Sequence, residues 1–104
     1  MNALVVEASL SFFSKNRKDE PIDRTYHSGL IVDFSIRKDM FNGGRIEFIE
    51  KLTAAAGEKD VKAIITFIYG ELVLPFVKEE LKYIFGEPSS PYGECKITKI
   101  VGYI

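Results

Sequence analysis

The sequence predicts an all-β protein, a small closed antiparallel β-barrel of about six strands formed by a single domain over residues 1–104. Apolar and polar residues alternate with a period of two along several short segments, which is the pattern of half-buried strands. Turn-forming residues separate these segments, and six or more short strands in one small domain favour a barrel or a sandwich. Hydrophobic residues make up 46% of the 104 residues, which is typical of a globular domain with its own core.

The first strand is predicted from the alternation in residues 4–13. One face carries Leu4, Val6, Ala8, Leu10 and Phe12, and the other carries Val5, Glu7, Ser9, Ser11 and Phe13. The polar segment 15–24 contains Pro21 and predicts a loop. The next strand has the clearest pattern in the sequence, because one face carries only apolar residues. These are Leu30, Val32, Phe34 and Ile36, which alternate with Ile31, Asp33, Ser35 and Arg37.

Residues 42–69 predict two more strands and the pieces that connect them. Asn42-Gly43-Gly44 predicts a turn, because glycine accepts the positive φ that such turns need. A strand follows, in which Ile46 and Phe48 alternate with charged residues. The segment 51–59 is ambiguous, but its three alanines and the later Gly57 favour a helical turn. VKAIITFIY (61–69) is rich in β-branched and aromatic residues and predicts a buried strand.

The segment ELVLPFVKEELKYIFGE (71–87) fits two predictions. A helix over 75–85 is favoured by Pro75 in its first turn, by apolar residues three to four apart and by Gly86 just past its end. Two strands joined by an acidic turn are favoured by the alternation around Tyr83, and Pro75 at a strand edge would cost little. We expect two strands over 72–86, whereas a helix would indicate a mixed α+β fold.

The C-terminal region predicts a loop at 88–93 and a final strand at 96–104. Cys95 lies between them and is the only cysteine, so it forms no intramolecular disulfide and no metal site of cysteines alone. The neighbouring Lys96 and Lys99 could lower the pKa of the thiol. A small structural residue is the preferred interpretation of Cys95.

The charge balance of the chain does not favour a strongly charged partner. The 14 basic and 15 acidic residues nearly cancel, which gives no overall attraction to nucleic acid or to an anionic membrane. The N-terminal apolar stretch has no Arg or Lys before it and is interrupted by Glu7 and Ser9, so we expect neither a signal peptide nor a membrane span. A cytoplasmic protein is the default expectation.

His27 is the only histidine in the chain. It would need a partner such as Asp33 or Glu20 to act as a general base, and the substrate geometry that a base requires does not follow from sequence. A zinc site needs three protein ligands, usually several histidines. We therefore interpret His27 as a surface residue and expect no metal and no cofactor.

The order of the segments resembles the third domain of elongation factor Tu, the C-terminal β-barrel of that GTPase, over nearly the whole chain. The first strand and its proline loop are similar in VEASLSFFSK (6–15) and EPI (20–22), and the next strands in YHSGLIVDF (26–34) and GGRIEF (43–48). AGEKDVKAIITF (56–67) is similar to the family's proline-glycine-aspartate turn and its long central strand. The most specific segment is 71–87, and PSSPYGECKITKI (88–100) keeps the family's spacing.

The resemblance implies two strands in 71–87 and a role in binding. In the family this barrel helps to hold aminoacyl-tRNA and packs on the GTPase domain and on the exchange factor. GGRIEF lacks the Gly-Lys-Ser/Thr ending of a phosphate loop, so no nucleotide is expected. Where the family has Arg-His-Thr and Gly-Gly-Arg-Thr, this chain has Lys18-Asp19-Glu20 and Pro88-Ser89-Ser90-Pro91, so we expect tRNA binding to be weak.

Two sets of residues are candidates for contacts with partners. The candidates for RNA are a basic cluster and a tyrosine that matches the family's: Lys15, Arg17, Lys18, Arg24 and Tyr26. Acids interleave with the cluster, which favours a solvated loop instead. The candidates for a protein interface are apolar residues expected to face outward: Val5, Phe13, Ile31, Ile49 and Ile64, with Ile68 beside them. The alternative is that 51–59 covers part of this face.

The sequence contains no catalytic constellation, and we do not expect an enzyme. We expect a non-catalytic binding module that docks on a protein partner or on a second copy of itself, in a symmetric dimer. The alternative is a weak RNA- or tRNA-binding protein related to translation.

Overall fold

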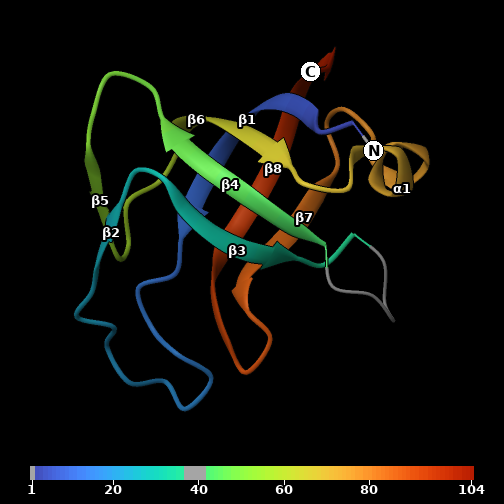
Figure 1. Ribbon diagram of the computed structural model, residues 1–104. Coiled ribbons are helices and arrows are strands. Elements are labelled where there is room, and N and C mark those ends of the chain that lie inside the picture. The colour runs from blue at the N-terminus through green and yellow to red at the C-terminus, as the bar shows by residue number, and fades with distance from the viewer. Residues whose placement is uncertain (1, 37–41) are drawn as a thin grey trace.

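The computed structural model describes residues 2–36 and 42–104 and shows a closed antiparallel β-barrel (Figure 1). Within these residues six strands form the barrel in the order β1-β6-β4-β3-β7-β8, and all neighbours are antiparallel. Their bounds are β1 Leu4–Phe12, β3 Leu30–Phe34, β4 Gly43–Phe48, β6 Val61–Phe67, β7 Lys82–Glu87 and β8 Ser90–Tyr103. The predicted all-β class and the closed six-stranded barrel are confirmed.

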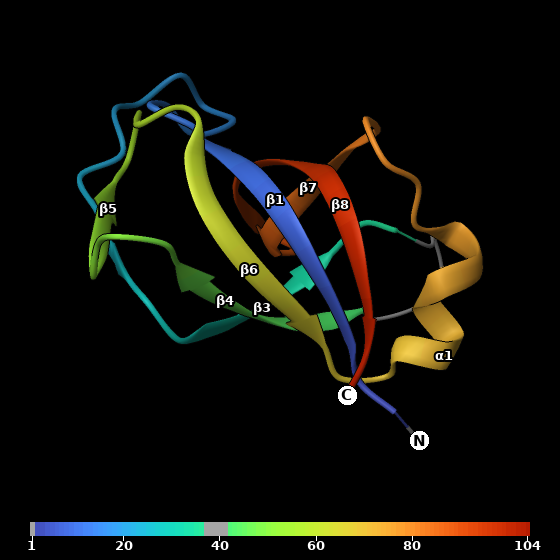
Figure 2. The ribbon, with the colours of Figure 1, turned by 90° about the horizontal axis from the view of Figure 1, so that it is seen from above.

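Two smaller pieces lie on opposite sides of the barrel. β2 (Thr25–His27) and β5 (Thr53–Ala55) form a separate two-stranded ribbon. The short helix α1 (Gly70–Val73) continues into the 3-10 turn η1 (Leu74–Phe76). Figure 2 places the ribbon on one side and α1, together with both chain ends, on the other.

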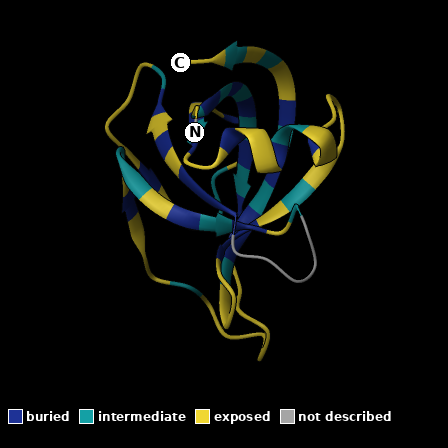
Figure 3. Ribbon diagram, turned by 45° about the vertical axis from the view of Figure 1, so that its right-hand side comes forward, coloured by how far each residue is buried: buried dark blue, intermediate teal, exposed yellow. Residues whose placement is uncertain are grey.

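The barrel interior is filled by the apolar faces that the alternation predicts. Buried residues alternate strictly with more exposed ones along β1 and along β6 (Figure 3). Three fully buried rings meet in the middle, because Phe34 lies 5.1 Å from Phe67 and 5.9 Å from Phe85 between ring centroids. Aromatic pairs at such distances add to the stabilisation that burial alone provides.

The segment 71–87 forms neither one helix nor two strands. Its first part is helical through Phe76, and its last part is strand β7. The Tyr83 hydroxyl explains where the helical part ends, since it donates to the Phe76 carbonyl oxygen (3.0 Å) and accepts from the Lys78 amide (3.1 Å). These bonds satisfy backbone groups near the end of the helical turn. The prediction of two strands over 72–86 is wrong for the first strand and correct for the second.

Residues 51–59 contain the strand β5 and not a helical turn. Ala54 is buried while Thr53 and Ala55 are exposed, which is a period of two. Ala54 lies opposite Tyr26 in the pairing of β5 with β2. Local propensity for helix is weak compared with such pairing and burial. The loop predicted at 88–93 is also shorter than expected, since β8 already begins at Ser90.

Gly43 and Gly44 belong to strand β4 and not to a turn. A Cβ atom at Gly44 would lie 2.8 Å from Cε1 of Phe34, so this position leaves no room for a side chain. Glycine therefore serves close packing here and not a positive φ. The strand predicted over 30–36 ends at Phe34, and the expected place of Arg37 lies outside the described residues.

Candidate binding pocket

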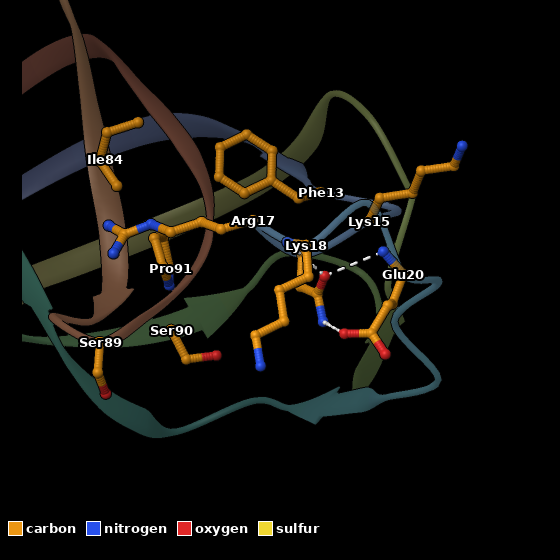
Figure 4. A pocket seen from close by; sticks show the side chains of 10 residues that line it. Phe13, Lys15, Arg17, Lys18, Glu20, Ile84, Ser89, Ser90 and Pro91 are labelled. Atoms are coloured by element: carbon orange, nitrogen blue, oxygen red, sulfur yellow. Dashed lines mark hydrogen bonds between the residues drawn. The ribbon is translucent and has the colours of Figure 1, made fainter.

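A pocket of about 550 Å³ lies between the segment 13–20, which follows β1, and the hairpin that joins β7 to β8 (Figure 4). The segment contributes Phe13, Arg17 and Lys18, and the hairpin side contributes Ile84 and Pro91. The two walls are far apart in sequence but adjacent in space. Cations and apolar side chains therefore share one cavity.

The segment 13–20 is held in shape by Asn16. The Asn16 side-chain oxygen accepts hydrogen bonds from the backbone amides of Lys18 (2.9 Å) and Glu20 (3.0 Å). The backbone amide of Asn16 donates to the backbone carbonyl of Glu20 (2.9 Å). Asp19 has a left-handed φ of 62°, which short polar residues tolerate in such turns. These hydrogen bonds hold the backbone that carries Arg17 and Lys18, whose side chains are exposed.

The hairpin wall is tied to the rest of the protein through Tyr92. Its hydroxyl donates to Oε1 of Glu87 (3.0 Å) and accepts from Nη2 of Arg24 (2.8 Å). Burial, followed by the bond to Glu87, raises the pKa of the Tyr92 hydroxyl. The Tyr92 carbonyl also accepts from the Phe13 amide (2.9 Å), which joins the segment after β1 to strand β8.

The charges of the pocket are unevenly paired. Lys15 forms an ion pair with Asp19 at 3.5 Å, and the Glu20 carboxylate accepts from the Asn16 side-chain amide at 3.3 Å. Among the residues that the structure describes, no carboxylate lies within ion-pair distance of Arg17 or Lys18. The pocket thus presents two cations without an anionic partner in this part of the chain.

The apolar part of the pocket lies directly beside these cations. Ile84 is 40% exposed although it is a large aliphatic residue. Figure 4 shows the Arg17 side chain extending from its segment toward Ile84 and Pro91, with the Phe13 ring next to its path. A ligand that enters here can contact a hydrocarbon surface and a guanidinium group together.

The five RNA candidates do not form one surface. Lys15, Arg17 and Lys18 line the pocket, whereas Tyr26 is only 3% exposed and stacks on Phe12 at 4.6 Å. Burial raises the pKa of Tyr26. The Tyr26 ring therefore has no open face for a nucleic-acid base. The Arg24 guanidinium lies over the rings of Tyr92 and Tyr26 and serves that cluster.

The interface candidates are also divided. Phe13 lines the pocket, and Val5 and Ile49 are only partly exposed. Ile31 and Ile64 do face outward, with exposures of 60% and 40%. Ile31 has Arg45 as its neighbour across the strands, and Ile64 lies between Glu7 and Glu47, so charges interrupt this face. The other outward candidate, Ile68, is exposed and lies in the short connection between β6 and α1. The segment 51–59 pairs with β2.

The two residues considered for catalysis lie apart from the pocket. His27 is an exposed residue of β2. Cys95 is fully buried, and burial raises the pKa of its thiol to about 12. The suggestion that Lys96 and Lys99 lower this pKa is wrong, because desolvation dominates. In the described part of the chain no three His, Cys, Asp or Glu residues are grouped so as to hold a metal ion.

The hairpin side of the pocket is only weakly indicated by the sequence. Ile84 is out of phase with Phe85, the buried apolar residue of β7, which is the one signal that could have marked it as exposed. Ser89, Ser90 and Pro91 also line the pocket, and no pattern in their own segment indicates this. Their proximity to Arg17 and Lys18 depends on the closure of the barrel.

None of the helices in the described residues has the length and hydropathy needed to cross a membrane. Compared with known proteins, the chain matches no protein-family model and no curated protein.

Proposed function

We propose that this protein is a non-catalytic binding module that docks a protein partner in the pocket between segment 13–20 and the β7–β8 hairpin. One observation carries the proposal: Arg17 and Lys18, without an ion-pair partner among the described residues, stand beside the apolar side chains of Phe13, Ile84 and Pro91. Clefts with an apolar lining and a few polar groups are the usual form of ligand sites.

The alternation of charges around the pocket favours a protein partner over a nucleic acid. Asp19 and Glu20 directly follow Arg17 and Lys18 in the sequence, and the whole chain has a net charge of −1. Nucleic-acid affinity depends on neutralising many phosphates, and adjacent carboxylates repel them. A peptide needs only local complementarity, which two cations and an apolar surface supply.

The fold agrees with a role in docking. A closed six-stranded antiparallel barrel is compatible with the resemblance to the third domain of elongation factor Tu, a domain that works by packing on other proteins and on tRNA. A barrel leaves few strand edges open. Partners would therefore meet its side chains at the ends and loops, where this pocket lies.

RNA binding remains the second candidate, because Lys15, Arg17 and Lys18 line one cavity together with Phe13. An aromatic ring beside cations is a feature of single-stranded nucleic-acid sites. Tyr26 does not contribute to it, since its ring is buried.

A selection from a phage-displayed library of random peptides tests the proposal. We expect selected peptides to shift the amide resonances of 13–20 and 84–91 and to leave those of the β2–β5 ribbon unchanged. A parallel fluorescence titration with mixed tRNA at physiological salt should show weak binding or none. Tight, salt-sensitive tRNA binding with no selectable peptide would overturn the proposal in favour of RNA.

A further inference from the structure

We infer that the pocket recognises a peptide in which an acidic side chain lies next to a large aromatic or aliphatic one. The inference rests on the proposed function and specifies the chemistry of the partner. It follows from the charge, the apolar surface and the rigidity of the two walls.

The acidic residue of the peptide is inferred from the two cations Arg17 and Lys18. Both side chains are exposed and have no ion-pair partner among residues 2–36 and 42–104. A guanidinium offers a carboxylate two parallel N–H donors, and charge-assisted hydrogen bonds are the stronger ones. Ser89 and Ser90 line the same cavity and bring two hydroxyl groups to it.

The large apolar residue of the peptide is inferred from the apolar surface that Phe13, Ile84 and Pro91 form. These side chains give the cavity a hydrocarbon surface next to the cations, and about 550 Å³ is within the range of roughly 300–1,000 Å³ seen for ligand sites. A ligand with an anionic group alone would leave this surface in contact with water. An aromatic or aliphatic neighbour of the acidic residue would cover it, which is favourable.

The number of negative charges in the ligand is limited by the acids of the same segment. Asp19 already pairs with Lys15, and Glu20 lines the pocket itself. A ligand with many charges would approach these carboxylates and be repelled. One acidic group therefore fits the pocket better than a polyanion does.

The walls are positioned before a ligand arrives. Asn16 fixes the turn that carries Arg17 and Lys18, and Tyr92 fixes the hairpin through Glu87 and Arg24. Preformed sites lose less conformational entropy on binding, so short peptides can bind without a large interface.

Four fluorescein-labelled synthetic peptides of equal length test the inference. They carry at their centre Glu-Phe, Gln-Phe, Glu-Ala or Lys-Phe, flanked by Gly and Ser. We expect the Glu-Phe peptide to bind, and each of the other three to bind at least about fivefold more weakly, because each lacks the charge or the apolar contact. Fluorescence anisotropy gives the affinities.

Variants of the protein test whether the peptide binds in this pocket. The double change Arg17→Gln/Lys18→Gln should lower the affinity for the Glu-Phe peptide about tenfold or more. The control Lys62→Gln/Lys99→Gln removes the same charge from exposed positions on β6 and β8 and should leave affinity unchanged. Likewise Ile84→Thr should weaken binding, while Ile64→Thr should not, although both residues are 40% exposed.

The outcomes separate the inference from the function on which it rests. Equal binding of the Glu-Phe, Gln-Phe and Lys-Phe peptides at this pocket would overturn the acidic requirement and leave peptide docking intact. Failure of these four peptides, with library peptides of other chemistry binding at 13–20 and 84–91, would also overturn the inference alone. If neither the four peptides nor the library yields a binder, both are overturned.

Discussion

The guanidinium group of Arg24 lies over the ring of Tyr92, 4.4 Å from its centroid, and Nη2 donates a hydrogen bond of 2.8 Å to the Tyr92 hydroxyl. The two residues are 68 positions apart in the sequence. Their contact links the loop before β2 to the hairpin that forms one wall of the pocket. An arginine that was a candidate for RNA is thus part of the pocket's support.

The change Arg24→Ala should lower the free energy of unfolding by about 1–2 kcal/mol, because a cation–π contact and a hydrogen bond are lost. Urea denaturation followed by tyrosine fluorescence measures the difference. The matched control Arg17→Ala removes an arginine without an ion pair among the described residues and should change stability by no more than about 0.5 kcal/mol. Equal losses in the two variants would contradict the supporting role of Arg24.

Stability should fall as the pH rises above 9 because of Cys95. Its pKa is raised from 9.0 to about 12 by burial, so the folded protein keeps the proton while the unfolded chain releases it. The stabilising contribution is complete below pH 9 and is lost between pH 9 and about 12, with a slope of about 1.4 kcal/mol per pH unit.

Denaturant titrations at several pH values check this slope. The variant Cys95→Ala should be less stable at pH 7, because a cavity replaces the sulfur, and its stability should depend less steeply on pH. Burial also raises the pKa values of Tyr26 and Tyr92 above the usual 10.0 of a tyrosine, so the stability of both proteins should decline further above pH 10. An unchanged slope in Cys95→Ala would show that the thiol does not control it.

The change Gly44→Ala should destabilise the barrel by about 1–3 kcal/mol, because the new methyl group would lie 2.8 Å from the Phe34 ring. The double variant with Phe34→Leu should lose less than the sum of the two single losses, since a smaller side chain makes room. Strict additivity would mean that the ring is not the obstacle.

The change Tyr83→Phe should lower the free energy of unfolding by about 1–2 kcal/mol, because the Tyr83 hydroxyl is hydrogen-bonded to the backbone of both Phe76 and Lys78. We expect faster hydrogen exchange at the Lys78 amide in the variant, with the β7–β8 amides unaffected. Tyr69→Phe is the matched control, since Tyr69 is 53% exposed. Chemical shifts of the unchanged protein should be helical over 70–76 and extended over 82–87.

A substitution on the outer face of β3, β4 and β6 tests whether the protein self-associates. Ile31 and Ile64 were expected to support a dimer, but Arg45 and Glu47 lie between their strands and form an ion pair at 3.7 Å. We therefore expect Ile31→Glu to leave the molar mass unchanged in light scattering over a tenfold concentration range. A dimer that this variant converts to monomers would establish the face as an interface.

The sequence by itself determined the buried faces of the strands in which apolar and polar residues alternate. The period of two in β1 and β3 sorted Val6 and Leu10 from Glu7 and Ser9 without any structure, because side chains alternate across a strand. It also determined that the segment 15–24 is polar and carries exposed cations. These are local properties, and each depends on neighbours in the chain.

The tertiary structure decided which segments became helix or strand where local signals were weak. Residues 70–76 turn into a helix whose end is bonded by Tyr83, and Ala54 becomes part of a strand because it faces Tyr26. The position of the pocket also depends on the tertiary structure. Barrel closure pairs β7 with both β3 and β8, and the β7–β8 hairpin then lies beside the segment 13–20. No local pattern encodes a contact between residues as far apart in the sequence as Phe13 and Tyr92, because it depends on how all six strands close.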